Sequence, residues 1–128
     1  MGVMVGPIIP SVNDHEIDNI LRLASEYGAT SANYTLARLN GDVGEIFKDW
    51  LNRNYQDRAE KVWKKVAHLH GGQVNDSRFG VRMSGQGNYA ELLRSIFNSS
   101  RSKYFPDQKL KPLRTDLFRV NGNLNLFQ

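Results

Sequence analysis

The chain has 128 residues, no cysteine and a formal net charge of +4 at pH 7. This length suffices for one domain with a real core but not for two. Hydrophobic residues make up 40% of the chain and charged residues 23%, which excludes a disordered composition. The lack of cysteine excludes disulfides, thiolate metal sites and cysteine nucleophiles. No apolar run reaches about 18 residues, so we expect no membrane span, and a cytoplasmic protein.

The charge is unevenly distributed along the chain. Residues 1–76 carry 8 basic and 10 acidic side chains, whereas residues 77–128 carry 9 basic and 3 acidic ones. A basic C-terminal third can attract a polyanion such as nucleic acid. A solvated basic surface explains the same excess about equally well, so both interpretations stay open.

The N-terminal part predicts strand, helix and strand in succession. Residues 2–9 (GVMVGPII) form an apolar run typical of a buried strand in a parallel sheet. A helix follows, with Asn13 and Glu16 at the spacing of a capping box, and Gly28 ends it. Residues 31–39 (SANYTLARL) predict a second strand. The connections are short, so the two strands should be parallel.

Further amphipathic helices are predicted beyond the second strand. One begins after Asp42 and carries apolar residues at helical spacing up to Leu51. The next has a second capping-box pattern at Asp57 and Glu60 and ends at a glycine pair. Trp50 and Trp63 fall on the apolar stripes of these two helices and are expected in the core.

The rest of the chain predicts a C-terminal extension. Residues 73–88 are polar and glycine-rich, as in a loop, and residues 89–100 predict another helix. The tail from residue 103 has no clear period. We therefore expect two parts: residues 1–72, with both strands and their helices, and residues 73–128, an extension packed on the same core.

Two parallel strands are too few for a stable sheet. Parallel sheets need both faces covered, and the predicted helices suffice for one side. The chain also starts within a strand. We therefore expect either missing sequence to complete the sheet or the isolated chain to self-associate as a homo-oligomer through its open strand edges.

Polar side chains follow the first strand, at the sheet end where ligands bind in parallel α/β folds. Asp14 and His15 are candidates for acid–base or binding work. Helix capping explains Asn13 and Glu16 better. Arg38, near the end of the second strand, could hold a carboxylate or phosphate, although a salt bridge at the strand end is a somewhat better explanation.

Three further features carry weaker signals. Residues 76–89 (DSRFGVRMSGQGNY) place arginines and glycines before a helix, where an anion could bind, but form no complete nucleotide motif. His68 and His70 point in different directions, so we expect no metal site. The basic and aromatic residues from 101 onward could bind single-stranded nucleic acid. A solvated surface explains them better; they are Arg101, Lys103, Tyr104, Phe105, Lys109 and Lys111.

Several segments, taken in order, carry a family resemblance. They are GVMVGPIIPSVNDHEI, LARLNGDVGEIFKDWL, DRAEKVWKKV, NDSRFGVRMSGQGNYAELL and LFRVNGNLNLF. This order resembles the C-terminal region of radical S-adenosylmethionine proteins of the spore photoproduct lyase and DNA repair photolyase-like group. The resemblance covers nearly the whole chain.

The resemblance implies an α/β fold, namely a fragment of a partial (β/α) barrel. It would contain the last two parallel strands, three or four amphipathic helices and an irregular C-terminal tail. The family binds a 4Fe–4S cluster through a C-x3-C-x2-C loop and cleaves S-adenosylmethionine reductively. This chain has no cysteine. We therefore expect no cofactor in the chain itself and no activity from it alone; the cluster and S-adenosylmethionine belong to a full-length parent.

The resemblance also implies site residues. At the ends of the two strands, the positions expected to face S-adenosylmethionine are Pro10, Asn13, Asp14, Arg38 and Asn40. The positions expected on the substrate side are His15, Arg82 and Tyr89.

Three hypotheses about function follow. The first is the C-terminal part of a radical S-adenosylmethionine enzyme, whose partner is the missing N-terminal part of its own barrel and whose lyase substrate is unknown, with nucleic acid one candidate. The second is a stand-alone basic module that binds nucleic acid, and the third is a non-catalytic remnant that self-associates.

Overall fold

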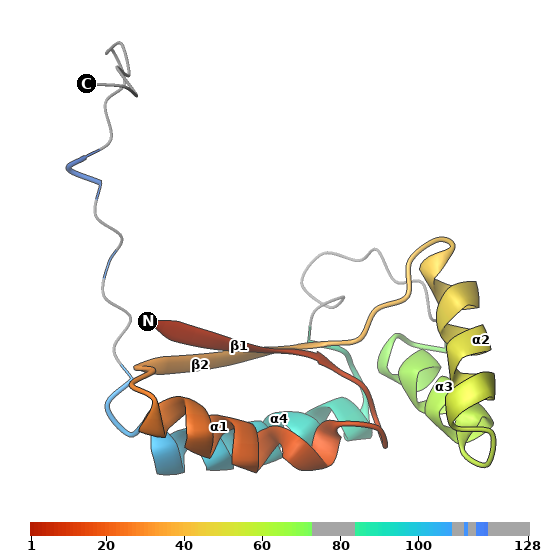
Figure 1. The fold of residues 1–128 in the computed structure, drawn as a ribbon, viewed down its shortest axis with the longest axis horizontal. Coiled ribbons are helices and arrows are strands. Elements are labelled where there is room, and N and C mark those ends of the chain that lie inside the picture. The colour runs from red at the N-terminus through yellow and green to blue at the C-terminus, as the bar shows by residue number, and fades with distance from the viewer. Residues whose placement is uncertain (73–83, 109–111, 113–114, 118–128) are drawn as a thin grey trace.

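The computed structural model describes residues 1–72, 84–108, 112 and 115–117, and Figure 1 shows its fold. A short parallel sheet lies on a layer of two long helices, and two further helices lie beyond one end of the strands (Figure 1). In chain order the elements are β1 (Gly2–Ile8), a 3₁₀ turn η1 (Asp14–Glu16), α1 (Ile17–Glu26), β2 (Ser31–Leu36), α2 (Val43–Asn54), α3 (Ala59–Leu69) and α4 (Asn88–Tyr104).

The two strands pair in parallel, as the sequence predicts. Gly2 lies opposite Ser31, and the register shifts between Val5 and Ile8. Pro7 falls in that interval and has no N–H to donate to a ladder. β2 ends at Leu36, three residues before the predicted end, so Arg38 lies in the following loop rather than in the strand.

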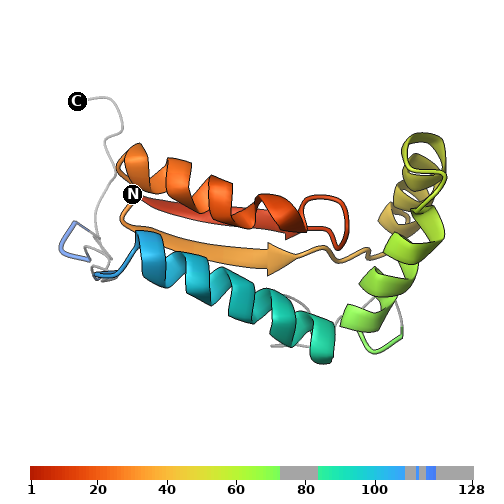
Figure 2. The same ribbon diagram turned by 90° about the horizontal axis from the view of Figure 1, so that it is seen from below.

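One face of the sheet is covered by α1 and α4, which run side by side along it (Figure 2). Alternate residues of the strands point into this layer, among them Val5 and Leu36, which are buried. From α4, Phe97 packs its ring 4.6 Å from that of Tyr34 on β2. α4 and the following Phe105 thus share one core with both strands and α1.

The opposite face of the sheet has no helix of the described residues over it (Figure 1). Its side chains are small or polar, except for Met4, which is 61% exposed. A Cβ on Gly6 would lie 2.6 Å from the Thr35 methyl carbon, so β1 and β2 approach closely on this side. The residues of this face, called the bare face below, are Gly2, Met4, Gly6, Ser31, Asn33 and Thr35.

A second, smaller core joins α2 and α3 to the segments that leave the strands. Leu51 of α2 and Val62 and Val66 of α3 are fully buried there, together with Leu39. The expected stripe of α2 is only partly buried: Val43 and Ile46 are 53% and 68% exposed.

Trp50 is not the core residue that the sequence predicts. It is 38% exposed and stacks on Phe47 along the surface of α2, with ring centroids 5.6 Å apart. Trp63 is half-buried and packs against the second core, so it lies closer to the predicted core position than Trp50 does. The periodicity of α2 is correct, but the described residues supply a neighbour for only one edge of its apolar stripe.

The predicted capping boxes do not form. Asn13 turns its side chain back to the loop after β1, and α1 begins at Ile17 without a side-chain cap. Glu60 pairs with Lys64 at 2.6 Å, and α3 also begins without a side-chain cap. In both cases a competing partner takes the side chain that the capping pattern assigned to the helix end.

The fold is mixed α/β, with two parallel strands and four helices in the described residues and a sheet that does not close. None of the described helices is both long and apolar enough to cross a membrane.

Candidate functional site at the carboxyl end of the sheet

The loop after β1 is held in a specific shape by its own polar side chains. Asn13 accepts a hydrogen bond from the Ile9 N–H at 2.7 Å and donates one to the Pro7 carbonyl at 3.0 Å. Ser11 has a positive φ of 62°, in the left-handed region that few residues other than glycine adopt. The Ser11 N–H donates to Asp14 Oδ2 at 3.0 Å. A residue strained in this way is often part of a functional loop.

Two other elements contact this loop. From α3, Lys65 Nζ donates to Ser11 Oγ at 2.7 Å, and just before α3 the Arg58 guanidinium donates to the Ser11 carbonyl at 3.4 Å. From the first turn of α4, the Tyr89 hydroxyl donates a hydrogen bond to Asp14 Oδ2. The loop, α3 and α4 therefore meet at the carboxyl end of β1.

Tyr89 contacts both the loop after β1, through Asp14, and α3, through Lys65. Burial raises the pKa of Tyr89 above its ordinary value of 10.0, and the hydrogen bond to Asp14 raises it further. Lys65 Nζ lies 4.8 Å from the centroid of the Tyr89 ring, a cation–π distance. The hydroxyl therefore stays protonated at neutral pH and acts as a donor to the Asp14 carboxylate.

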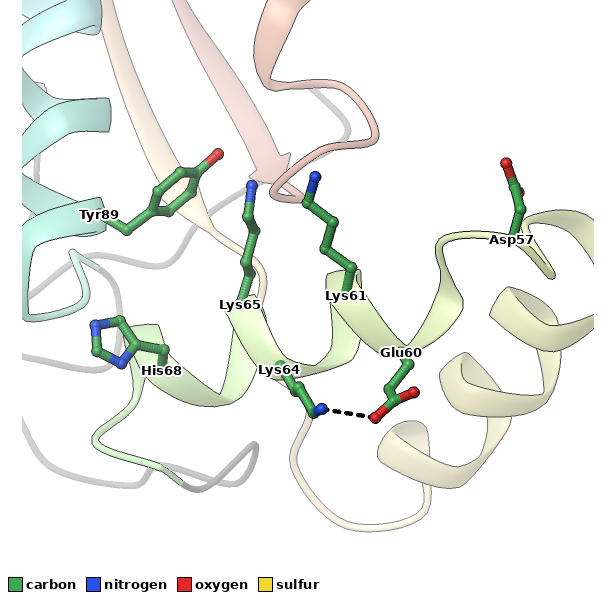
Figure 3. A pocket seen from close by; sticks show the side chains of 7 residues that line it. All are labelled: Asp57, Glu60, Lys61, Lys64, Lys65, His68 and Tyr89. Atoms are coloured by element: carbon green, nitrogen blue, oxygen red, sulfur yellow. Dashed lines mark ion pairs between the residues drawn. The ribbon is translucent and has the colours of Figure 1, made fainter.

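A groove of about 690 Å³ opens beside Tyr89, along the exposed side of α3. Figure 3 shows Lys61, Lys65 and Tyr89 extending their polar ends in the same direction, with His68 below Tyr89 and Asp57 at the far end. Lys64 points away from them and pairs with Glu60 (Figure 3). The lining residues are Asp57, Glu60, Lys61, Lys64, Lys65, His68 and Tyr89.

The residues expected to face a cofactor fall into different environments. Pro10 is fully buried, and the side-chain oxygen and nitrogen of Asn13 both bond backbone groups of its own loop. Asp14 belongs to the meeting point. Arg38 and Asn40 are exposed on the loop after β2, and within the described part of the chain neither shares a hydrogen bond with Asp14.

The residues expected on the substrate side also separate. Tyr89 lines the groove and binds Asp14. His15 is exposed in the 3₁₀ turn. Arg82, together with most of the arginine- and glycine-containing loop, lies outside the described residues.

The two histidines near the end of α3 lie in different environments. His70 is buried and its Nε2 lies 2.8 Å from the Ala37 carbonyl oxygen, whereas His68 is exposed beside the groove. Within residues 1–72 and 84–108, no three histidine or carboxylate side chains cluster in a way that could hold a metal ion. An iron–sulfur cluster does not fit this chain either, because it contains no cysteine.

Of the basic and aromatic residues from Arg101 to Lys111, the two aromatic ones are used in packing. Phe105 is buried, and the Tyr104 hydroxyl donates to Asp18 Oδ2 at 2.9 Å. Neither aromatic ring stands free as a platform for bases. Lys109 and Lys111 lie outside the described residues.

Sequence reasoning missed Ser11, Lys61 and Lys65. The spacing of Lys61, Lys65 and His68 at i, i+4 and i+7 was a signal, because it places three cationic or polar side chains on one face of α3. Ser11 gave no signal, since its strained φ and its lysine partner are visible only in the structure.

Comparisons with protein families, with characterised proteins and with solved structures find no match to this chain. Its fold and its site are therefore the grounds on which a function is proposed.

Proposed function

We propose that this chain is the C-terminal part of a radical S-adenosylmethionine enzyme of the photolyase-like group, and that it forms the far wall of that enzyme's barrel. The observation that carries the proposal is the asymmetry of the sheet. In a (β/α) barrel every helix lies outside the strands, and the inner face of the strands lines the interior. Here α1 and α4 cover one face, and no described helix covers the other.

The composition of the bare face supports the same proposal. A surface packed on another layer of helices would carry large aliphatic side chains. Apart from Met4, this face instead carries small side chains or side chains with hydrogen-bonding groups, namely Gly2, Gly6, Ser31, Asn33 and Thr35. Such a surface suits a barrel interior that receives a polar ligand.

The polar loops at the carboxyl ends of β1 and β2 support it further, because ligands of barrel enzymes bind at that end. Arg38 and Asn40 are exposed there and are the residues we propose for contact with S-adenosylmethionine. Asn13 would act indirectly, by holding the loop that carries Asp14. S-adenosylmethionine, when bound to a reduced cluster, supplies a 5′-deoxyadenosyl radical. The cluster ligands would come from the N-terminal part of the parent.

The first experiment is to read the DNA upstream of the codon for Met1. We expect an open reading frame in phase with this one that encodes a C-x3-C-x2-C motif. An in-frame stop codon directly upstream, with no such motif before it, would contradict the proposal.

The second experiment uses the full-length product of that frame, purified without oxygen and reconstituted with iron and sulfide. After reduction it should convert S-adenosylmethionine to 5′-deoxyadenosine. Arg38→Ala should weaken the equilibrium binding of S-adenosylmethionine by about tenfold, since a charged hydrogen bond contributes about 1.5 kcal/mol or more. Arg53→Ala removes the same charge on α2 and should leave binding unchanged. If the two variants bind S-adenosylmethionine with equal affinity, Arg38 does not contact this ligand.

A further inference from the structure

The edge of β2 that faces away from β1 carries the backbone groups of every second residue of the strand. The Ala37 N–H donates to the Ile8 carbonyl, so the odd-numbered residues of β2 direct their backbone groups toward β1. Ala32, Tyr34 and Leu36 therefore direct their N–H and C=O groups to the other side, where the described residues supply no strand. Such an edge is a template for pairing with a further strand.

The chain that leaves α4 arrives at this edge. Phe105, directly after α4, is buried in the core shared with the strands. Three residues later, Gln108 Oε1 accepts a hydrogen bond from the Ala32 N–H at 3.3 Å. A side-chain amide thus takes the place of a strand carbonyl at the first position of the edge. Tyr34 and Leu36, further along, are left for the residues that follow Gln108.

Part of the tail that follows Gln108 has the sequence pattern of a strand. The tail as a whole has no clear period, but residues 118–126 (FRVNGNLNL) alternate between two kinds of residue. The even positions carry no polar side chain, and the odd positions are all polar. The even set is Phe118, Val120, Gly122, Leu124 and Leu126, and the odd set is Arg119, Asn121, Asn123 and Asn125.

The two sides of this pattern match the two faces of the sheet. α1 and α4 bury one face, where Leu36 and Ala32 are covered, whereas the bare face carries Asn33 and Thr35 beside β2. A third strand next to β2 would place its apolar side chains on the helical layer and its asparagines on the polar side. Both sets of side chains would then meet neighbours of their own kind.

The Asn121–Gly122 pair also suits a two-residue hairpin turn. Such a hairpin would place Val120 opposite Asn123 on one face, and it would mix apolar and polar side chains in the same way at each further pair. The strict alternation is lost in that arrangement. A single continuous strand is therefore the better match.

We propose that residues 118–126, which lie outside the described residues, pair with the free edge of β2 in the same molecule as a third strand. The six residues of β2 span roughly 20 Å at about 3.3 Å per residue. Residues 109–117 lie between Gln108 and the proposed strand and can extend over about 30 Å, so either end of β2 is within reach. The pairing closes an edge that would otherwise attract other chains. It does not rest on the proposed function.

The experiment is hydrogen–deuterium exchange of the full chain, followed residue by residue by NMR. The N–H groups of Tyr34 and Leu36, called the edge amides, should exchange slowly, as should that of Asn33, which faces β1. Edge amides that exchange as fast as those of an unfolded peptide would overturn the inference. Protection by the chain's own tail does not depend on protein concentration. Protection that increases with concentration would assign the edge to a second copy and would also overturn it.

A matched pair of double variants then identifies the segment. Leu124→Asp/Leu126→Asp should accelerate exchange of the edge amides by about tenfold or more, because the strand loses the burial of two leucines. Asn123→Asp/Asn125→Asp adds the same two charges on the polar side and should leave the edge amides protected.

The Asn33 amide is the internal control, because its exchange should be the same in both double variants if β1 and β2 stay paired. Equal acceleration of the edge amides by the two double variants would show that the alternation of residues 118–126 plays no part in the pairing. The measurement needs no cluster and no upstream sequence, so its outcome is independent of the radical enzyme proposal.

Discussion

At the scale of single residues, the Tyr89–Asp14 hydrogen bond joins the start of α4 to the loop after β1. The two residues are 75 positions apart in the chain, so the bond stabilises a long-range contact rather than a local turn. The same loop holds Ser11 in a positive φ through the Ser11–Asp14 and Ser11–Lys65 bonds. The loop therefore depends on partners from three parts of the sequence.

Tyr89→Phe should lower the free energy of unfolding by about 1 kcal/mol at neutral pH, because it removes one partly exposed hydrogen bond to a carboxylate. The raised pKa of Tyr89 means that the bond is fully present below pH 10.0 and is lost only as pH rises through the folded value. Urea unfolding at pH 7 measures the change. Tyr27→Phe is the matched control, since Tyr27 is 83% exposed. Equal effects of the two substitutions would contradict the role given to Tyr89.

At the scale of elements, α1 and α4 are joined by polar bonds as well as by their shared core. Asp18 on α1 accepts hydrogen bonds at 2.9 Å from the Ser100 hydroxyl and from the Tyr104 hydroxyl, both on α4. Ser25 donates to the Tyr104 carbonyl at 3.1 Å near the other end of α1. These contacts set how the two helices lie along the sheet.

The Asp18 contacts should make stability depend on pH in the acid range. Hydrogen bonds from Ser100 and then from Tyr104 lower the pKa of Asp18 below its ordinary value of 3.8. The carboxylate therefore stabilises the fold above about pH 4, and this contribution is lost as pH falls through the lower folded value. Asp18→Asn should reduce the midpoint of thermal unfolding at pH 7, and the difference from the unmodified chain should shrink at acid pH.

Thermal melts of both proteins across the acid range check this prediction. Asp49→Asn is the control, because Asp49 pairs with Arg53 on the exposed surface of α2, where such pairs contribute little. If the two proteins differ in unfolding midpoint by the same amount at every pH, that outcome contradicts a role for the Asp18 charge.

At the scale of the whole molecule, the described chain leaves apolar and hydrogen-bonding surface uncovered. Among the described residues β1 and β2 are each other's only strand neighbours, so each has one edge without a strand partner. Met4 is exposed on the bare face, and Ile46 is exposed on α2 beside the stacked Phe47 and Trp50 rings. The N-terminal barrel part proposed above would cover such surfaces in a parent protein.

The isolated chain should therefore self-associate. Its weight-average molar mass, measured by sedimentation equilibrium, should rise with protein concentration. Met4→Lys and Ile46→Lys should each shift the chain toward monomer, because each places a charge on one exposed apolar surface. Asn52→Lys, at an already polar and exposed position of α2, should have no effect. A clean monomer at every concentration would contradict the expected association.

The order of elements could be predicted from the sequence because it depends on local patterns. The apolar run of residues 2–9 and the helical spacing of Ile17, Leu21 and Ala24 need no distant partner to be recognised. The same holds for α3, where Val62 and Val66 fall on the buried side as expected. The structure confirms these elements and the parallel pairing of β1 with β2.

The candidate site was only partly predictable. Asp14 and Tyr89 were both named from the sequence, but nothing in their positions indicated that they bond to each other. Asn13 looked like a helix cap because the capping pattern is local, yet the Ile9 N–H and the Pro7 carbonyl take its side chain. Competition between local and distant hydrogen-bond partners is decided by the complete fold, and a sequence pattern displays only the local ones.

By itself, therefore, the sequence determined that this chain forms a parallel β-α-β unit followed by further amphipathic helices, because periodicity and chain connection control those features. Only the tertiary structure decided that α4 returns to lie beside α1 on one face of the sheet, since that depends on Phe97, Leu93 and the Asp18 bonds meeting partners far away in the chain. The same return of α4 brings Tyr89 to Asp14 and Lys65. It leaves the bare face uncovered and creates the groove along α3.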